Sequence, residues 1–456
     1  MLQRTTVFAC LAGIVLLGLY QDAARHLQAQ GAQGVPAATV AFTNVNVVPM
    51  DTNRVLRDQT VIVTKDRIAA VGPGAKITIP EGATRVDGKG KFLMPGLAEM
   101  HGHIPPPTMP KAYVDDVLYL YVAAGITTVR GMQGAPGQLE LREASKRGEI
   151  VAPALYLAGP PFTAKSVTTP AEAVDFVKKQ KAEGWDLIKV MPGPSTENYD
   201  SMAKTAKEVG IPFAGHVPPL VGLPHVLEMG QSTIDHIDMY AEHLEGVTKP
   251  VTDAAVQDIV ARTKKAGTVM VPTLYVWETL RGPITVESRT SLPELKYMPR
   301  QVVATWTKGL ETRLSQPQYN AAEAKVYIDN RMKIMTSLYK SGVRILLGSD
   351  APQQFNVPGF SIAHEMKRMA DAGMTTFDIL SSGTSLVGEY YKAQDDFGTV
   401  AAGKRADLVL LDANPLEGLD NVAKRAGVMI RGRWLPAAEI QKKLEEMAAR
   451  NATATP

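Results

Sequence analysis

The stretch FLMPGLAEMHGH, residues 92–103, decides how the rest of this sequence is interpreted. It begins with an apolar run that is typical of a buried strand, and it ends in the histidines His101 and His103. Alternate residues of a strand point the same way, so both imidazoles would face one point at the carboxyl end of the strand. Neutral imidazole nitrogens placed in this way suit zinc or a similar metal ion. A lone pair of this kind also occurs by chance, so the prediction depends on what the other strand ends carry.

Beyond residue 92, short β-branched runs alternate with helical stretches at a spacing of roughly thirty residues, which is the rhythm of βα units around a parallel sheet. The candidate strands are Phe92-Leu93, Ile126 to Arg130, Ala154 to Ala158, Leu187 to Met191, Pro212 to Gly215, Ser232 to Asp235, Thr268 to Pro272 and Val343 to Gly348. They predict an α/β fold with a (β/α)8 TIM-type barrel over residues 92–394. The charged stretch from Glu278 to Tyr327 exceeds what a barrel helix needs, and we expect part of it to form a cap or lid near the pocket.

Both ends of the remaining chain have strand character. Val40 to Val48 and Thr60 to Val71 precede the barrel region, and Ala406 to Leu411 and Gly427 to Trp434 follow it. We expect residues 38–91 and 395–440 to pair in one small β-sandwich domain beside the barrel. Residues 441–456 would form a charged C-terminal helix and a tail.

Residues 1–33 differ from everything that follows. Arg4 gives a positive start, Val7 to Leu19 is apolar, and small residues near Ala29 or Ala32 offer cleavage sites. This order predicts a secretory signal peptide and export to the periplasm or the extracellular space, with a retained membrane anchor as the alternative. The sole cysteine, Cys10, lies in this segment, so a mature chain would form no disulfide and would bind metal through nitrogen and oxygen.

The composition is that of a soluble globular protein, with 45% hydrophobic residues, 21% charged residues and a net charge of +3 over 456 residues. No basic run with interleaved aromatic residues occurs, which argues against a nucleic-acid partner. The expected partner is a small-molecule substrate. A membrane contact is expected only if the leader is retained, and association into a homo-oligomer stays open.

Three further candidate ligands stand at the ends of candidate strands, namely His216, His236 and Asp350. The carboxyl ends of all strands of a (β/α)8 barrel open on the same face. Four of the eight histidines fall at such ends, which scattered histidines would not do. The sequence therefore predicts a metal site on that face.

Lys189 is a charged residue inside the apolar strand Leu187 to Met191, and we expect its side chain to point toward the same face of the barrel. It could instead be a solvated lysine, or one paired with a carboxylate. Burial beside cations would lower its pKa, and a neutral lysine can react with carbon dioxide. The carbamate formed is a carboxylate-like group that could bridge two metal ions.

The sequence resembles the amidohydrolase superfamily, in particular its imidazolonepropionase-related and metal-dependent prolidase-like members. The resemblance covers nearly all of the chain beyond the leader. Its motifs are Leu93 to Leu97 leading into His101-Gly102-His103, Gly125 to Arg130, Gly348 to Pro352, and Gly398 to Val409. After Lys189 the run Val190 to Pro194 departs from the glycine-rich run of the prolidase-like members, which leaves dipeptide specificity open.

The resemblance implies two divalent metal ions, expected to be zinc. His101 and His103 would bind the more buried ion, His216 and His236 the more exposed one, and carboxylated Lys189 would bridge them. Asp350 would bind the buried ion and act as the general acid and base, exchanging a proton with a hydroxide held between the metals. The implied reaction is hydrolysis of a C–N bond in an amide, a peptide-like molecule or a cyclic amide.

Four other residues are candidate substrate contacts. Arg130 ends the second strand and could pair with a substrate carboxylate or form a structural ion pair. Tyr240 and His243 follow His236 in a βα loop, and His364 follows the eighth strand in a helix where it could also have no role. Glu99 is expected on the same side as the histidine pair, either as an acceptor for a ligating histidine or in a structural salt bridge.

Alternative functions stay open at this point. A mononuclear deaminase or cyclic-amide hydrolase on the same barrel usually places an acid shortly after the fifth-strand histidine, but Val217 to Leu220 follows His216 here. A lactonase would use the same parts as an amidase. A non-catalytic binding protein would be expected to have lost ligands, and none is missing.

Overall fold

The structure is a computed structural model that describes residues 39–453. The predicted leader with Cys10, and the last three residues of the predicted tail, lie outside the described residues. Within residues 39–453, no helix has both the length and the apolar character needed to cross a membrane.

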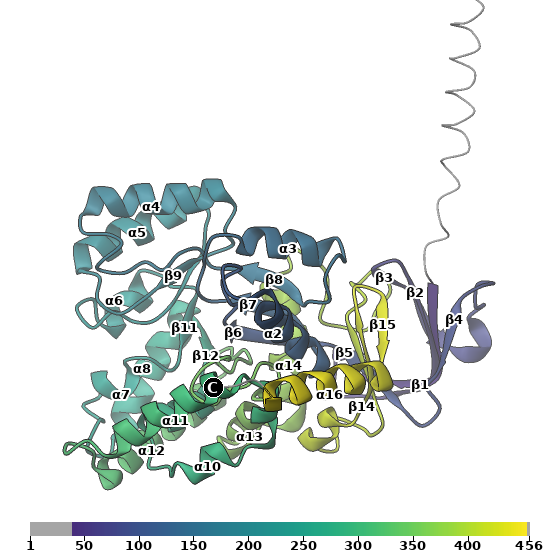
Figure 1. Cartoon of the computed structure of the whole chain (residues 1–456). Helices are drawn as coiled ribbons and strands as arrows, with labels where there is room; N and C mark the ends of the chain where they lie inside the picture. Colours follow the sequence, from purple (N-terminus) through teal and green to yellow (C-terminus); the bar gives the residue numbers. More distant parts are fainter. Residues whose placement is uncertain (1–38, 454–456) are drawn as a thin grey trace, which may run out of the picture.

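Strands from both ends of the described chain form one sheet, with the early strands in purple beside the late strands in yellow in Figure 1. Its order is β15-β14-β13-β5-β1-β2-β3, and β4 pairs with β1. The strands are β1 (Thr39–Val47), β2 (Leu56–Thr64), β3 (Arg67–Pro73), β4 (Thr84–Asp87), β5 (Phe92–Pro95), β13 (Leu408–Leu411), β14 (Arg425–Ile430) and β15 (Arg433–Pro436). β-branched residues such as those of Thr60 to Thr64 favour these strands because their side chains pack well on a pleated surface.

This sheet curls so that its two halves share one core. The Phe42 ring on β1 meets the Trp434 ring on β15 edge-on at 5.1 Å, although three strands separate β1 from β15 in the sheet order. Buried side chains of β1, β2, β13 and β14 join in one cluster, including Val45, Val63 and Leu410.

The first predicted barrel strand is wrong. Phe92 and Leu93 lie in β5, which pairs with β13 and β1 in the small sheet, and the first strand of the parallel part is β6 (Leu97–Gly102). The chain changes sheets within two residues, because the Gly96 N–H donates to Asp407 and the Leu97 N–H donates to Gly125. One continuous apolar run therefore holds two strands, and the parallel part begins near residue 97 instead of 92.

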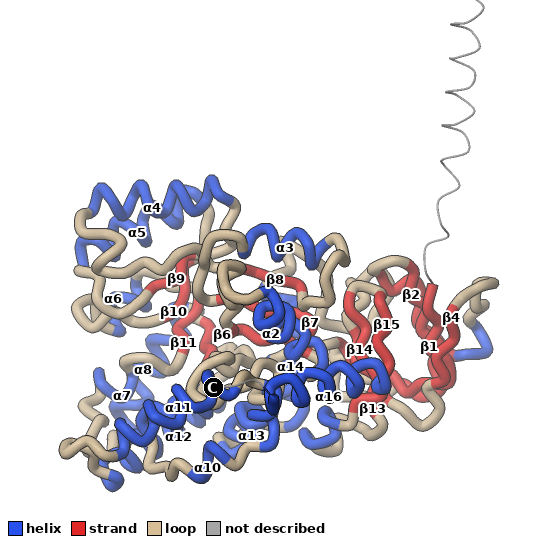
Figure 2. The backbone as a smooth tube through the Cα atoms, viewed as in Figure 1, coloured by secondary structure: helices blue, strands red, loops and turns tan. Residues whose placement is uncertain are grey.

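The parallel strands form two sheets. One is β6-β7-β8, with β7 (Ile126–Gly131) and β8 (Ala154–Leu157), and the other is β12-β11-β10-β9. The strands of the second sheet are β9 (Ile188–Val190), β10 (Phe213–Gly215), β11 (Thr233–Asp235) and β12 (Val269–Val271). With helices between these strands, the predicted α/β class is confirmed (Figure 2).

Backbone hydrogen bonds join these two sheets at both edges. At one edge, Ala158 and Leu187 form a parallel bridge. At the other edge, the predicted eighth strand forms a single β-bridge, between Ile345 and Met270. Its backbone nevertheless hydrogen-bonds to both parallel sheets. The Leu346 N–H donates to Met270 at 2.8 Å, and the Leu347 carbonyl accepts from Met100 at 2.8 Å.

The helices cover the parallel strands, and sequence signals mark several of their ends. Thr169 and Glu172 form a capping box at the start of α4, and Gly184 ends that helix in the left-handed conformation. The helices are α2 (Lys111–Ala123), α3 (Gln138–Lys146), α4 (Pro170–Glu183), α5 (Thr196–Val209), α6 (Leu223–Glu228), α7 (Tyr240–His243), α8 (Asp253–Ala266), α9 (Leu274–Arg281), α10 (Glu287–Thr290), α11 (Arg300–Leu314), α12 (Ala321–Lys340), α13 (Ile362–Asp371), α14 (Thr376–Ser382), α15 (Ser385–Tyr390) and α16 (Ala437–Thr453). The predicted insertion thus comprises the second half of α9, the helices α10 and α11, and the start of α12, and the C-terminal helix begins four residues earlier than expected.

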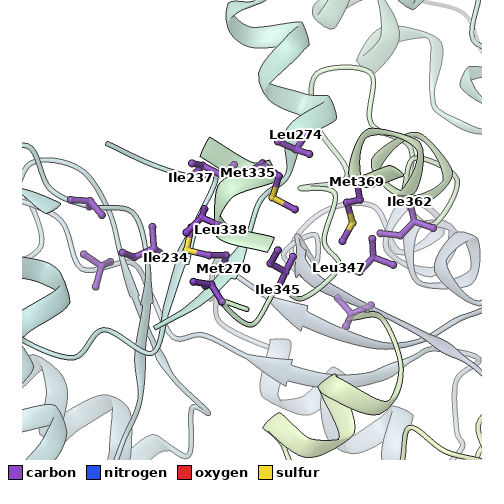
Figure 3. Packing of buried hydrophobic residues seen from close by; sticks show 14 of the residues in the cluster. Ile234, Ile237, Met270, Leu274, Met335, Leu338, Ile345, Leu347, Ile362 and Met369 are labelled. Atoms are coloured by element: carbon purple, nitrogen blue, oxygen red, sulfur yellow. The ribbon is translucent and has the colours of Figure 1, made fainter. Parts of the chain in front are cut away.

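Figure 3 shows part of the buried hydrophobic cluster between the parallel strands and these helices. Ile234 and Met270 project from β11 and β12, and Ile345 and Leu347 come from the eighth segment. Met335 and Leu338 of α12 and Met369 of α13 belong to the same buried cluster. These contacts hold the carboxyl ends of the strands in place.

Arg405 connects the small sheet to the parallel part. It is 2% exposed, its Nε donates to Asp407 at 2.5 Å, and Nη1 pairs with Asp395. Its Nη2 donates to Thr128 on β7 at 2.7 Å, and the guanidinium lies 4.2 Å from the centre of the Phe397 ring. A buried cation is thereby fully paired.

We expect Arg405→Met to destabilise the fold strongly. The change leaves the buried Asp407 carboxylate without its partner, which costs about 3–5 kcal/mol. Urea unfolding followed by circular dichroism measures the loss. The exposed Arg433 serves as the control, since Arg433→Met should change the free energy of unfolding by less than about 0.5 kcal/mol. Equal stability of the two variants would contradict this role of Arg405.

Candidate metal centre

Two histidines at the end of β6, His101 and His103, meet Asp350, which follows the predicted eighth strand, Val343 to Gly348. His103 Nε2 lies 2.7 Å from Asp350 Oδ1, and His101 Nε2 lies 3.5 Å from the same oxygen. One ligand atom of each residue lies within 4.8 Å of those of the other two. His101 and Asp350 are buried and His103 is partly exposed, so this group is open on one side.

The other two predicted histidines extend this group into a row. The ring of His236, after β11, lies 4.3 Å from that of His101, and the ring of His216, after β10, lies 4.7 Å from that of His236. His236 Nδ1 is also 3.8 Å from Asp350 Oδ2. Four imidazoles from three strand ends therefore stand side by side.

Lys189 reaches the same place from β9. Its side chain is buried, and Nζ lies 3.4 Å from His101 Nε2. Burial lowers the pKa of Lys189, and the charge of Arg130 adds to this, although Asp235 and Asp350 act in the opposite direction. Lys189 therefore lies in the row, as expected, and the alternative of a solvated lysine is not what the structure shows.

The Lys189 side chain occupies the space left by a glycine. A Cβ atom on Gly215 would lie 2.6 Å from the Val190 carbonyl oxygen and 2.9 Å from Lys189 Cδ, and Gly215 has a φ of +121°. Only glycine satisfies both conditions without strain.

Polar groups behind the row orient three of the imidazoles. Asp235 Oδ2 is 2.8 Å from His101 Nδ1, Asp238 Oδ2 is 3.2 Å from His216 Nδ1, and Thr273 Oγ1 is 2.7 Å from His236 Nδ1. The Nε2 atoms are left as the free nitrogens. Burial, together with neighbouring positive charges, holds the pKa of His101 and of His236 well below the ordinary value, which favours the neutral form that binds metals.

Glu99 joins the two segments that carry the first three ligands. Its Oε1 accepts from the N–H groups of His101 at 3.0 Å and Ser349 at 2.7 Å, and its Oε2 accepts from the Ser349 hydroxyl at 2.5 Å. Burial raises the pKa of Glu99 to about 8. Glu99 thus accepts hydrogen bonds from His101 and Ser349, beside the candidate ligands. It forms neither of the two contacts expected from the sequence, a bond to an imidazole or a salt bridge.

His236 and Asp350 both adopt left-handed backbone conformations, each with a φ of +68°. Such conformations are uncommon outside glycine, although histidine and aspartate tolerate them better than most residues. The carbonyl oxygen of His236 accepts a hydrogen bond from the buried Arg331, whose guanidinium lies 4.6 Å from the centre of the Trp277 ring. Arg331 on α12 therefore supports the turn that presents His236.

Arg130 is a structural residue, not the proposed substrate contact. Its side chain is fully buried, and it donates to Met100, Thr233 and both oxygens of Asp235 at 2.5–3.2 Å. The structural ion pair that the sequence left open is the arrangement observed.

The other three predicted substrate contacts are not brought to the row. The buried hydroxyl of Tyr240 bonds to Thr263 on α8 at 2.7 Å, because the short helix α7 turns it into the core. His243 is exposed at the end of α7, and within residues 39–453 no hydrogen bond joins it to the row. His364 bonds to Glu294 at 2.7 Å and stacks on Tyr275, so it holds the insertion against α13.

The donor set fits divalent metal ions. Four histidines and an aspartate offer nitrogen and oxygen atoms of the kind that bind zinc in catalytic sites, and the described residues contain no cysteine. The polar groups that orient the imidazoles are those typical of metal sites.

These features define a metal-dependent hydrolase on an α/β scaffold. A model of the amidohydrolase family matches residues 92–435. The chain belongs to this family, which confirms the predicted resemblance, and it is a hydrolase that acts on carbon–nitrogen bonds.

Solved structures share the fold. A bottromycin amidohydrolase superposes with a TM-score of 0.72 at 22% identity, covering 91% of this chain and 90% of its own. A candidate prolidase from Bifidobacterium longum gives a TM-score of 0.68 at 21% identity, covering 91% of this chain and 100% of its own. In sequence, 74 residues are 38% identical to adenine deaminase 2 of Bradyrhizobium sp. (strain ORS 278), which is 16% of this chain and 12% of that enzyme.

The sequence analysis missed the residues that orient the ligands. Asp235 and Asp238 flank His236 in the stretch Thr-Ile-Asp-His-Ile-Asp, so acids beside a predicted ligand were an available signal. Thr273 and Arg331 gave no such signal, because they come from a distant loop and from α12.

We expect Glu99→Ala to loosen the site, since it leaves buried N–H groups of His101 and Ser349 without an acceptor, at about 2–4 kcal/mol. Glu99→Gln keeps one acceptor oxygen and should lose less than half as much. Urea unfolding and zinc titration measure both effects. Wild-type stability in Glu99→Ala would contradict the role of this carboxyl group.

We expect Gly215→Ala to displace Lys189 and to reduce both metal content and activity at least about tenfold, because the new Cβ meets Val190 and Lys189. Elemental analysis and hydrolysis assays test this. Gly210→Ala is the matched control, since Gly210 also has a positive φ but a Cβ there would meet nothing within 4 Å, so only stability should fall. Full metal content in Gly215→Ala would be the contrary result.

Proposed function

We propose that this protein hydrolyses an amide bond with two divalent metal ions, in the manner of the prolidase-like amidohydrolases. The observation that carries the proposal is the row of four imidazoles with the buried Lys189 and Asp350 beside it. A single ion would need only part of this set.

In this proposal His101, His103 and Asp350 hold one ion, and His216 and His236 hold the other. Lys189 carries a carboxylate and contributes it to both. The carbamate forms when the lysine nitrogen attacks the carbon of CO2 and releases one proton, and the product is an anion suited to divalent cations. The burial of Lys189 next to His101 supports this role.

When bound, two such ions lower the pKa of a shared water and polarise the carbonyl group of the substrate. Asp350 is the general base and then the general acid. Its Oδ1 lies between His101 and His103, where it can take the proton of the attacking water and return it to the leaving nitrogen. The bond from Glu99 to the neighbouring Ser349 keeps this carboxylate in place.

Deamination is the second candidate function, because the short sequence match is to an adenine deaminase. It would release ammonia from a carbon–nitrogen bond with fewer metals. The presence of Lys189 in the row favours amide hydrolysis with two ions.

We also propose a closed (β/α)8 barrel, supported by the backbone bonds at both edges of the parallel sheets, and a small β-sandwich, supported by the contact between Phe42 and Trp434. Residues 1–33 would direct export as a signal peptide. Amino-terminal sequencing of the protein recovered from cells tests this part, and a chain that still begins at Met1 in the cytoplasm would contradict it.

We expect two metal ions per wild-type chain, and in Lys189→Ala fewer ions and an activity loss of at least about a thousandfold, because the shared anion is gone. Elemental analysis and hydrolysis of an amide panel measure both. Added formate or acetate should partly restore Lys189→Ala, which misfolding could not explain. The exposed Lys204 on α5 gives the control, Lys204→Ala. One ion or none in the wild type, with full activity in Lys189→Ala, would overturn the proposal.

A further inference from the structure

A small cavity opens beside the exposed histidine of the row. It has a volume of about 270 Å³, and its lining residues are His103, Ile104, Pro105, Pro106, Met109, Tyr113, Gln133, Gly134, Ala135, Pro352 and Gln353. Three different strand ends thus contribute to it. Its volume lies near the lower limit for small-molecule sites, so it suits a single residue-sized group.

The lining includes no aspartate, glutamate, lysine or arginine side chain. Ile104, Pro105, Pro106, Met109 and Tyr113 make one side apolar. Gln133 and Gln353 add the amide groups, and within residues 39–453 neither amide side chain is hydrogen-bonded. The metal ions of the proposed function are engaged by the attacking water and the substrate carbonyl, so the cavity lining itself can offer neutral donors and acceptors but no cation.

The nearby cations are turned away or engaged. Lys111 lies between Met109 and Tyr113 in sequence, but its side chain is 82% exposed and bonds to Asp115 one turn further along α2. Arg130 is fully buried and bound to Asp235, and Arg331 is buried behind His236. Lys189 lies within the metal-binding row itself.

The position of the cavity assigns it to one half of the substrate. Pro352 and Gln353 lie two and three residues after Asp350, and His103 contacts the Asp350 carboxylate at 2.7 Å. In the proposed reaction Asp350 delivers a proton to the leaving nitrogen, so the group attached to that nitrogen lies nearest to this cavity. The amine half of the substrate is the half that enters it.

On the basis of the proposed function, we infer that this cavity selects substrates whose amine half is uncharged and largely apolar. A free dipeptide or an N-acyl amino acid carries a carboxylate on that half, and a carboxylate desolvated without a cation is costly. The substrate class is therefore that of N-acylated amines and amide-capped residues.

The test uses pairs of substrates that differ only in that charge. Acetyl, benzoyl and aminoacyl groups are each joined to leucine and to leucinamide, and kcat/KM is measured with the zinc-loaded full chain. We expect leucinamide compounds to be preferred at least about tenfold for each acyl group, with most of the difference in KM. A preference for the free carboxylate would overturn the inference while leaving amide hydrolysis intact.

A variant that gains activity toward the leucine compounds gives a result that misfolding could not explain. Gln353→Arg places a cation at the cavity, so it should raise the ratio of kcat/KM for each leucine compound to kcat/KM for its leucinamide partner about tenfold. Gln441→Arg on the exposed face of α16 adds the same charge elsewhere and should leave this ratio unchanged. An equal effect of both variants would contradict the assigned location.

The two proposals fail in different ways. If neither member of any pair is hydrolysed although two metal ions are present, amide hydrolysis is wrong and the selectivity falls with it. If amides are hydrolysed but charge makes no difference, only the inference about the cavity is wrong.

Discussion

The contact between β6 and the segment that ends in Asp350 determines the geometry of the site. The Asp350 N–H donates to His101 and the His103 N–H donates to Ala351, both at 2.7 Å, and Glu99 binds Ser349 from the other side. Three of the six candidate ligands therefore take their positions from hydrogen bonds between chain segments about 250 residues apart. Side-chain contacts alone would leave the rotamers of these residues free, so the hydrogen bonds of the backbone are what fixes their positions.

Charge balance behind the ligands depends on Asp235. Burial opposes its ionisation, but neighbouring positive charge, above all that of Arg130, outweighs burial and lowers its pKa. The resulting carboxylate accepts the Nδ1–H of His101 and so leaves Nε2 for a metal ion. Arg130 is thus the counterion of Asp235, the carboxylate that orients His101, and does not itself face a substrate. This pairing explains why a charged residue at a strand end is fully buried.

The sequence sufficed to predict the α/β class and the side chains that the structure brings together in the row, because both follow from regular patterns. Period-two spacing places His101 and His103 on one side, and parallel strands bring His216, His236 and Asp350 to one face. The errors arise where a pattern has two physical solutions. Phe92 to Leu97 is one apolar run but crosses between two sheets, and Tyr240 follows His236 closely but is turned into the core by a left-handed Met239. Tertiary packing decides such cases, and no local signal reports it.

Ligands and selectivity have different physical origins in this molecule. The candidate ligand row uses strand ends that backbone hydrogen bonds hold in place, and its geometry alone does not select one amide substrate over another. Selectivity among substrates depends on which charged side chains around the site are free to contact the substrate. Here Arg130 and Arg331 are both committed to holding the ligands, and the cavity beside His103 is lined by proline, methionine and glutamine. The cations that could have recognised an anionic substrate are the same ones that keep the imidazoles in place, so precise ligand positions and anion recognition compete for them.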